Sequence, residues 1–414
     1  MLTPSENQVM PFRIATSDRE QLFTWLVAPL GVYAKHLEEF IAEPSGVDEI
    51  EDKTAFRLLK SDPEARLLVY FHGNSATIAQ QRRTEEYRSY SSGASGKMFV
   101  LAFDYRGFGN SSGTPSERGL LSDAQAVVDW ALNTAKISPD RIVLLGHSLG
   151  TAVVAGIAHQ YAKMGIEFKG LVLCAAFTNA GGAFASYSIG GIVPVLAPIK
   201  LSPALQRWFS SKMKDTWQSD HRLAELGRMS NMHAPERGSN GTRTEENTDY
   251  IPGTCSGLQV VFMHAENDTT MPWVETESLF KSTLQAAIEG ASPHNGIPKD
   301  LKVVDLGEAG RQEVWQCGTR CIQKTIAKHG GKRVCSQHPA PSPGFHYSAQ
   351  QQRLDGFSLL LTRAISKCGL LHEALQPHVS ALHTDAVRTQ HLGVTNPVLS
   401  MLSSTKMPRQ PVPS

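Results

Sequence analysis

The chain has 414 residues, of which 41% are hydrophobic and 19% are charged, and its formal net charge is +1. This composition is typical of a folded, water-soluble protein, and the length is enough for one large domain with insertions or for two ordinary domains. A net charge so close to zero gives no electrostatic basis for nucleic acid or an anionic surface as the main partner.

The N-terminal residues 1–19 are polar and lack the basic start and apolar run of a signal peptide. The longest apolar stretch, Ile189–Ile199, is interrupted by Pro194 and Pro198 and is too short to span a bilayer. The sequence therefore predicts a cytoplasmic protein.

The cysteines form no zinc-ligand spacing and no paired framework; they stand at positions 174, 255, 317, 321, 335 and 368. Only Cys317 and Cys321 lie close together, at a spacing that would place both thiols on one face of a helix. We interpret them as a reduced, half-buried pair, and we expect no metal site.

Short apolar runs that end in turn residues predict the strands of a parallel sheet. Four such runs come first and two follow late in the chain: Arg66–Phe71, Met98–Phe103, Arg141–Leu145, Leu171–Leu173, Leu258–Met263 and Leu301–Leu306.

Helical patterns lie between these runs. Apolar residues from Leu120 to Ala131 recur on one helical face, and Thr114–Glu117 predicts a capping box with Pro115 at the first helical position. The mostly apolar or small residues of Thr151–Met164 predict a second, buried helix. Alternating strands and helices predict an α/β protein with a doubly wound, mostly parallel sheet, whose site lies at the carboxyl ends of the strands.

Two regions depart from this alternation. Between Gly181 and Gly257 the sequence predicts an inserted lid, which becomes amphipathic at Leu205–Phe209 and ends in a polar, disordered loop at Glu236–Asn247. Residues 332–414 lack sustained periodicity except for the helix-like Leu354–Ile365. We therefore expect one α/β domain over residues 1–331 and a poorly ordered C-terminal tail over residues 332–414.

Ser148 is the predicted nucleophile, in the motif Gly146-His147-Ser148-Leu149-Gly150. The serine follows an apolar strand and precedes a helix of small residues, which is the setting that the Gly-x-Ser-x-Gly motif requires. Glycines on both sides allow a sharp, strained turn without clashes between the strand and the helix.

The predicted oxyanion hole combines two backbone N–H groups. His72-Gly73-Asn74-Ser75 follows the first predicted strand, and the N–H of Asn74 could join that of Leu149 in binding the developing negative charge. The alternative is a polar turn with a structural histidine.

Asp268 is the predicted acid of the triad. It lies after the predicted strand Leu258–Met263, so that the serine and the acid follow the chain order serine, acid, histidine. Glu266 in the same loop is the rival, but Pro272, four residues beyond Asp268, marks the usual exit from such a loop.

A glycine-rich turn follows the second predicted strand. Gly107, Gly109 and Gly113 are spaced one residue wider than a dinucleotide-binding fingerprint, which raises the alternative of an NAD(P)-dependent dehydrogenase. That alternative leaves the serine motif unexplained. We interpret the stretch as a structural turn in which Arg106 pairs with a carboxylate.

These motifs together resemble the α/β-hydrolase-domain lipases, a family that includes lysophosphatidylserine and monoacylglycerol lipases. The resemblance runs from about Pro11 to Gly331, and Leu306–Trp315 is similar to a feature of fungal members. It rests on Phe103–Leu120, Gly146–Thr151, Ala176–Asn179 and His264–Asp268.

The resemblance implies the α/β-hydrolase fold and hydrolysis of a lipid, lysolipid or other small-molecule ester through an acyl-enzyme. It implies no cofactor and no obligate protein partner. Peripheral contact with a membrane would follow from a lipid substrate.

The sequence departs from this family at the triad histidine. Relatives carry glycine-glycine-histidine-asparagine-aspartate after the last strand, and their histidine aligns with Lys332. His329, at the end of the helix-like stretch Gln323–Lys328, is the predicted base, and His338 and His346 are further candidates. The alternative is a catalytically impaired hydrolase-fold protein that lacks the histidine.

Overall fold

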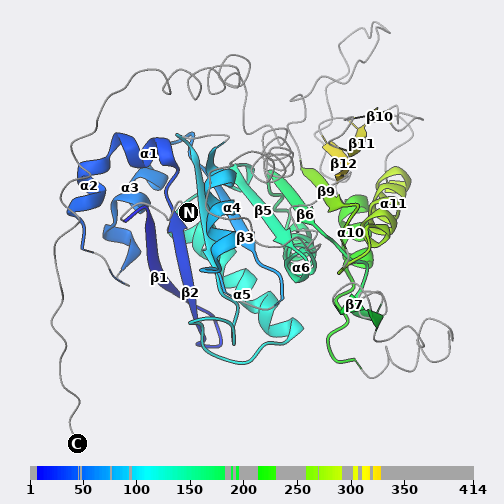
Figure 1. Ribbon diagram of the computed structural model, residues 1–414, viewed down its shortest axis with the longest axis horizontal. Helices are drawn as coiled ribbons and strands as arrows, with labels where there is room; N and C mark the ends of the chain where they lie inside the picture. The colour runs from blue at the N-terminus through cyan, green and yellow to red at the C-terminus, as the bar shows by residue number, and fades with distance from the viewer. Residues whose placement is uncertain are drawn as a thin grey trace, which may run out of the picture. The chain divides into compact units, whose positions relative to one another are not determined.

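The computed structural model describes most of the first 330 residues (Figure 1). The chain divides into two compact units after residue 370, and all described residues lie in the first. They are residues 7–44, 46, 49–74, 77–92, 96–181, 188–189, 193–194, 213–229, 258–268, 270–290, 302–305, 310–317 and 320–327.

Ten of the described strands form one sheet. In chain order they are β1 (Val9–Ala15), β2 (Gln21–Val27), β3 (Arg66–Phe71), β4 (Met98–Phe103), β5 (Ile142–His147), β6 (Gly170–Cys174), β9 (Gln259–Ala265), β10 (Lys302–Asp305), β11 (Gly310–Cys317) and β12 (Arg320–Ala327). In space their order is β1-β2-β4-β3-β5-β6-β9-β12-β11-β10. The stretch from β4 to β12 is parallel, and β2 and β11 run antiparallel to their neighbours.

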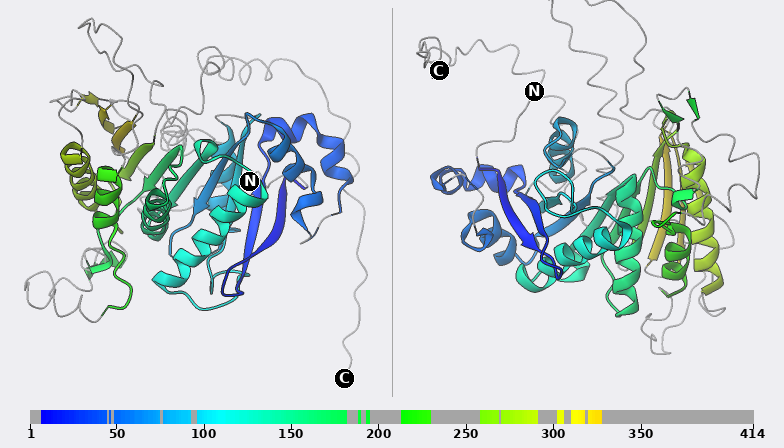
Figure 2. Two further views of the ribbon diagram at one scale, coloured as in Figure 1. Left: turned by 180° about the vertical axis from the view of Figure 1, so that it is seen from behind. Right: turned by 90° about the horizontal axis from the view of Figure 1, so that it is seen from below.

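Helices cover both faces of the sheet, as the alternating pattern predicts. Figure 1 shows α4 in front of the sheet, and the view from behind in Figure 2 shows α5 in front. The described helices are α1 (Leu30–Lys35), α2 (Leu37–Ala42), α3 (Thr54–Ser61), α4 (Gln81–Ser92), α5 (Glu117–Asp129), α6 (Leu149–Lys163), α10 (Ser219–Met229) and α11 (Trp273–Gly290), with the short turns η1 (Ile50–Asp52), η2 (Trp130–Thr134) and η3 (Pro139–Arg141).

The central strands form because their apolar runs are buried on both faces. Every residue of β4 and β6 is buried, and so is every residue of β3 after Arg66. α6 is buried along most of its length, since it packs between the sheet and the helices α5 and α10. The predicted strands from Arg66 to Met263 are thereby confirmed, with end shifts of at most two residues.

The last predicted strand was placed wrongly. Leu301–Leu306 was expected to be a buried parallel strand, whereas β10 is antiparallel and pairs with β11 at the end of the sheet. The place beside β9 is taken by β12, which pairs with β9 from Cys321 to Ala327.

The stretch Gln323–Lys328 was predicted to be helical, but its residues up to Ala327 belong to β12. Lys324 and the polar residues on either side of it obscured the strand, because a lysine rarely points into a core. Its side chain is fully buried and forms an ion pair with Glu277 of α11. Its Nζ lies 4.8 Å from the centre of the Phe280 ring. A buried charge paired in this way is compatible with a central strand.

The predicted helix carrying Cys317 and Cys321 is also wrong. Cys317 ends β11 and Cys321 lies near the start of β12, so the two belong to opposite arms of a β-hairpin. Cys174 and Cys321 are buried free thiols. The remaining cysteines, at 255, 335 and 368, lie outside the described residues.

α5 begins two residues later than the predicted capping box implies. Ser116 is the N-cap, and its hydroxyl accepts a hydrogen bond from the N–H of Gly119 at 3.1 Å. Pro115 lies before the cap, against Gly107. The carboxylate of Glu117 accepts hydrogen bonds from the N–H groups of Thr216 and Trp217 instead of closing a capping box.

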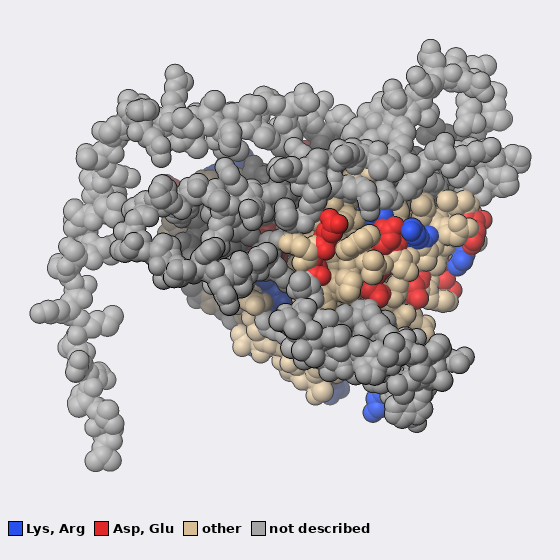
Figure 3. All heavy atoms as spheres, turned by 45° about the vertical axis from the view of Figure 1, so that its right-hand side comes forward, with Lys and Arg blue, Asp and Glu red and all other residues tan. Residues whose placement is uncertain are grey.

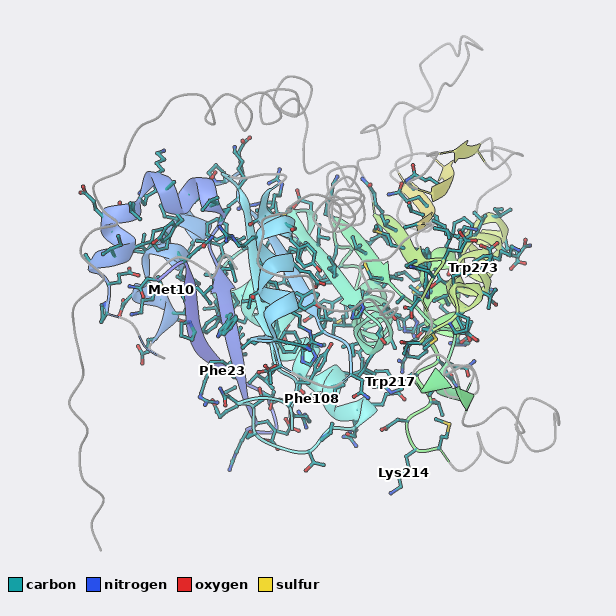
Figure 4. All side chains as sticks on the ribbon, in the orientation of Figure 1. Met10, Phe23, Phe108, Lys214, Trp217 and Trp273 are labelled. Atoms are coloured by element: carbon teal, nitrogen blue, oxygen red, sulfur yellow. The ribbon has the colours of Figure 1, made fainter. Side chains whose placement is uncertain are left out.

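Part of the predicted lid forms a core helix. The segment with Lys214 and Trp217 (Figure 4) leads into α10, whose Leu223 and Leu226 are buried against the neighbouring helices. The short strands β7 (Ser188–Ile189) and β8 (Val193–Pro194) are also described. The amphipathic stretch Leu205–Phe209 lies outside the described residues, so the lid stays a prediction.

The polar loop Glu236–Asn247 and the C-terminal tail 332–414 likewise lie outside the described residues. Where side chains are described, the face that carries α10 and α11 mixes both signs of charge (Figure 3). Arg228 pairs there with Glu289 at 3.3 Å, and Lys281 with Glu277 at 3.1 Å. None of the described helices is long and apolar enough to cross a membrane.

Candidate active site

Ser148 stands on a strained turn between β5 and α6, as the motif predicts. Its backbone has φ 52° and ψ −116°, a conformation that residues other than glycine rarely adopt. The turn is fastened on both sides, because the N–H of Ser148 donates to the carbonyl of Cys174 at 2.9 Å and its own carbonyl accepts from Thr151. Ser148 remains partly exposed.

The two flanking glycines are required by close approaches of backbone. A Cβ atom on Gly150 would lie 2.0 Å from the carbonyl oxygen of Phe71, at the end of β3. One on Gly146 would lie 2.5 Å from the carbonyl oxygen of Gly150. The motif therefore brings the start of α6 directly against the end of β3.

The segment that follows β3 lies beside the nucleophile. A Cβ atom on Gly73 would be 3.3 Å from the Cβ of Ser148 and 3.0 Å from Nδ1 of His147. Asn74 comes next and is exposed. Leu149 is the first residue of α6, so its N–H has no acceptor within the helix. The structure thus places Gly73, the residue before Asn74, against Ser148, and the oxyanion hole stays a prediction.

His72 is buried beneath this segment, and its ring holds the backbone there. Its Nδ1 donates to the carbonyl of Gly73 at 2.8 Å, since a carbonyl can only accept. Burial, assisted by the charge of Arg83, lowers the pKa of His72 to about 3. A buried imidazole with so low a pKa is a weak base, and its bond to the carbonyl of Gly73 commits it to the loop, so His72 is not the base of a triad.

Lowering the pH from about 7 to about 5 is expected to reduce the free energy of unfolding by about 2 kcal/mol through His72. The unfolded imidazole, with its ordinary pKa of 6.5, binds a proton over this range, whereas the folded one does not. The contribution of His72 to the free energy of unfolding is complete above the pKa of its imidazole in the unfolded chain. It is lost as the pH falls towards the pKa of the imidazole in the folded protein.

Urea titrations at the two pH values measure this loss. His72→Asn keeps a side-chain N–H for the carbonyl of Gly73 but does not titrate. Between the two pH values its free energy of unfolding should therefore fall by about 2 kcal/mol less than that of the wild type. Equal losses in the two proteins would contradict the assignment to His72.

Asp268 lies in the loop at the carboxyl end of β9, where the sequence placed the acid. Its side chain is 12% exposed. Its Oδ1 accepts hydrogen bonds from the N–H groups of Thr270 and Met271 at 2.8 and 3.2 Å. The rival Glu266 is exposed, and its backbone N–H donates to the carbonyl of Ala327 at 2.7 Å. The carboxylate of Asp268 is thus the one that the loop holds in place.

His264 supports this loop, a role that sequence reasoning did not assign. Its ring is buried at the end of β9, with Nδ1 2.7 Å from the hydroxyl of Thr276 and Nε2 2.9 Å from the carbonyl of Met271. Nε2 also lies 3.8 Å from Oδ2 of Asp268. A histidine at the end of an apolar strand could have indicated this role from the sequence. Only the contacts of His264 show that it supports the loop that carries Asp268.

The predicted base, His329, lies outside the described residues, as do His338 and His346. No hydrogen bond joins the hydroxyl of Ser148 to an imidazole within the described part of the chain. Ala327, the last residue of β12, lies beside the acid loop through its bond to Glu266.

The glycine-rich turn after β4 is structural, as interpreted from the sequence. Gly107 and Gly109 have φ 73° and 51°, and a Cβ on Gly109 would lie 2.0 Å from the carboxylate of Asp104. Arg106 pairs with Asp123 at 2.8 Å and with Asp18 at 2.7 Å. Because the turn is packed against the protein's own side chains, the dehydrogenase alternative loses its only support.

Comparison with known proteins agrees with the described fold. The model of the alpha/beta hydrolase family matches residues 68–299, more than half of the chain. The lysophosphatidylserine lipase ABHD12 of Danio rerio is 28% identical over 220 residues, covering 53% of this chain and 48% of that protein. Protein ABHD12B of Homo sapiens is 37% identical over 123 residues, covering 30% and 33%.

The chain thus spans about half, or less, of the length of these relatives. Among solved structures, an alpha-beta hydrolase from Vibrio vulnificus is 16% identical with a TM-score of 0.42, covering 69% of this chain and 71% of that one. The likeness of Leu306–Trp315 to fungal members stays a prediction.

Proposed function

Because the chain belongs to the alpha/beta hydrolase family, we propose that it is a serine ester hydrolase with Ser148 as its nucleophile. The observation that carries the proposal is the strained conformation of Ser148, a partly exposed residue between β5 and α6 at the carboxyl edge of the sheet. Strain of this kind is retained where it aims a reacting group.

The proposed reaction begins when Oγ of Ser148 bonds to the carbonyl carbon of the ester and its proton passes to an imidazole. The N–H groups of Asn74 and Leu149 bind the resulting oxyanion. The C–O bond to the alcohol then breaks, and the imidazole returns the proton to the alcohol. Water repeats the sequence on the acyl-enzyme and releases the acid.

We assign the base to His329 and its orientation to Asp268. The argument for His329 is its distance along the chain. It stands two residues after Ala327, whose carbonyl is bonded to the acid loop, and two extended residues span about 7 Å. A side chain at that position is within reach of the loop that holds Asp268.

The proposed substrate is a lipid ester, such as a lysolipid or a monoacylglycerol. Support comes from the relatives whose name is lysophosphatidylserine lipase, and from the sequence motifs that resemble such lipases. A lipid substrate would bring the protein to a membrane surface as a peripheral protein. Residence in the cytoplasm is our expectation from the sequence.

A second candidate function is that of an impaired hydrolase-fold protein. The feature in its favour is Lys332, which stands where the resemblance to the α/β-hydrolase-domain lipases implies the triad histidine. Without a base, the oxyanion hole and bound substrate would leave only a small fraction of the activity, several powers of ten below that of an intact triad.

A fluorophosphonate probe separates the two candidates on the full chain. We expect a covalent adduct on the peptide that contains Ser148 and none in Ser148→Ala, with circular dichroism showing that both proteins are folded. A folded wild type without an adduct would overturn the proposed activity and favour the impaired protein. Hydrolysis of a monoacylglycerol, a lysophosphatidylserine and a short soluble ester then ranks the substrates.

The same experiment identifies the base. His329→Gln should label at least about a thousandfold more slowly than the wild type. His338→Gln and His346→Gln should label at the wild-type rate. A large loss of labelling rate in one of these two variants, with none in His329→Gln, would assign the base to that residue instead.

A further inference from the structure

Arg83 lies in the first turn of α4 and is almost completely buried, with 8% of its surface exposed. Its guanidinium reaches back to the segment between β3 and α4. Nη1 donates to the carbonyl of Thr77 at 2.7 Å, and Nη2 lies 3.4 Å from the carbonyl of Gly73. One side chain therefore spans both ends of the segment that carries Asn74.

Neighbouring contacts fix the same segment. The carbonyl of Gly73 also accepts the hydrogen bond from His72, and the N–H of Ile78 donates to Oδ1 of Asp104 at 2.8 Å. Arg83 is close enough to His72 and Asp104 for its charge to act on the pKa values of both side chains. The segment is thus held from the buried side, by an arginine, a histidine and an aspartate.

The orientation of one peptide group connects these contacts to the nucleophile. In a trans peptide the C=O and the N–H point in opposite directions, and the described part of the chain has no cis peptide bond. The carbonyl of Gly73 points to the buried side, towards His72 and Arg83. The N–H of Asn74 therefore points away from His72 and Arg83. The backbone at Gly73, which precedes this N–H, lies against Ser148.

We propose that Arg83 is a positioning residue of the oxyanion hole: by holding the carbonyl of Gly73 it aims the N–H of Asn74 at the developing oxyanion. The inference rests on the proposed function. The planar guanidinium suits this role because it presents several donors in a rigid fork, so that two carbonyls can be bonded at once. A lysine has a compact ammonium on a flexible stem and would not hold both ends equally well.

Arg83→Met is expected to lower kcat by about ten- to a hundredfold, somewhat less than the loss of a whole oxyanion donor. KM should change by no more than about twofold, because the oxyanion forms only in the transition state. Arg83→Lys should fall between the wild type and Arg83→Met. Arg88→Met, which removes a charge from the same helix, serves as the control and should keep the wild-type kcat.

Inhibitors separate positioning from general destabilisation. A trifluoromethyl ketone that forms a tetrahedral adduct should lose affinity by the same factor as kcat/KM in Arg83→Met. A matched amide that stays planar should bind as it does to the wild type. Equal losses for both inhibitors, or an unchanged kcat in an active enzyme, would overturn the proposal.

Amide hydrogen exchange tests the same contact without relying on turnover. The peptide spanning residues 72–78 should exchange at least about tenfold faster in Arg83→Met than in the wild type or Arg88→Met. Unchanged exchange would overturn the proposal. A wild type that neither labels nor turns over would overturn the proposed function instead, and the exchange rates would still decide whether Arg83 holds this segment.

Discussion

Replacement of Asp268 with asparagine is expected to lower kcat by about four orders of magnitude. The side-chain oxygen of asparagine can still accept hydrogen bonds from Thr270 and Met271, so the loop should keep its shape. The negative charge that stabilises the imidazolium in the transition state is lost. Steady-state hydrolysis of a soluble ester measures the change, and thermal unfolding shows whether the variant is folded.

Glu266→Gln is the matched control, because Glu266 belongs to the same loop and was the rival for this role. Its side chain is exposed, and its described bond to Ala327 uses the backbone. We expect its kcat to stay within about twofold of the wild type, as is usual for an exposed charge away from the reacting atoms. Loss in Glu266→Gln with activity retained in Asp268→Asn would reverse the assignment of the acid.

Replacement of Gly150 with alanine is expected to lower the free energy of unfolding by about 3 kcal/mol or more. The new methyl carbon would lie 2.0 Å from the carbonyl oxygen of Phe71, 2.6 Å from the carbonyl carbon of that residue and 3.0 Å from the carbonyl oxygen of His72. These atoms belong to the backbone at the end of β3, so no side-chain rotation relieves the clash. α6 and β3 would have to separate, and the nucleophile would move from the oxyanion donors.

Urea unfolding and probe labelling measure the two effects of this substitution. Gly96→Ala provides the control, because no atom of the described residues lies within 4 Å of the position of its Cβ. Its free energy of unfolding should stay within about 1 kcal/mol of the wild type. A Gly150→Ala protein with wild-type stability and labelling would contradict the close packing of the motif against β3.

The central strands were predictable because each consists of a short apolar run that local sequence alone identifies. β3 and β4 begin and end at the predicted residues, and β5, β6 and β9 differ by one or two. Together with the family match, the order of the strands confirms the predicted α/β-hydrolase fold.

β12 was missed for a physical reason. Its register places Lys324 in the core, and the partners that make this tolerable, Glu277 and Phe280, come from α11, more than forty residues earlier. The local sequence does not identify Gln323–Lys328 as a buried strand, since no residue near Lys324 in the sequence can neutralise its charge. For the same reason the sequence predicted β10, and not β12, as the late parallel strand.

The sequence by itself determined the position of Ser148, since the two glycines, the apolar strand and the small-residue helix are all local features. It also placed Asn74 and Asp268 after strands whose carboxyl ends share one edge of the sheet.

Only the tertiary structure decided how the surroundings of Ser148 are held. The neutral state of His72, the support of the acid loop by His264 and the reach of Arg83 to Gly73 each depend on burial or on contacts between different elements. Such contacts depend on where folded elements meet, which one short stretch of sequence does not encode.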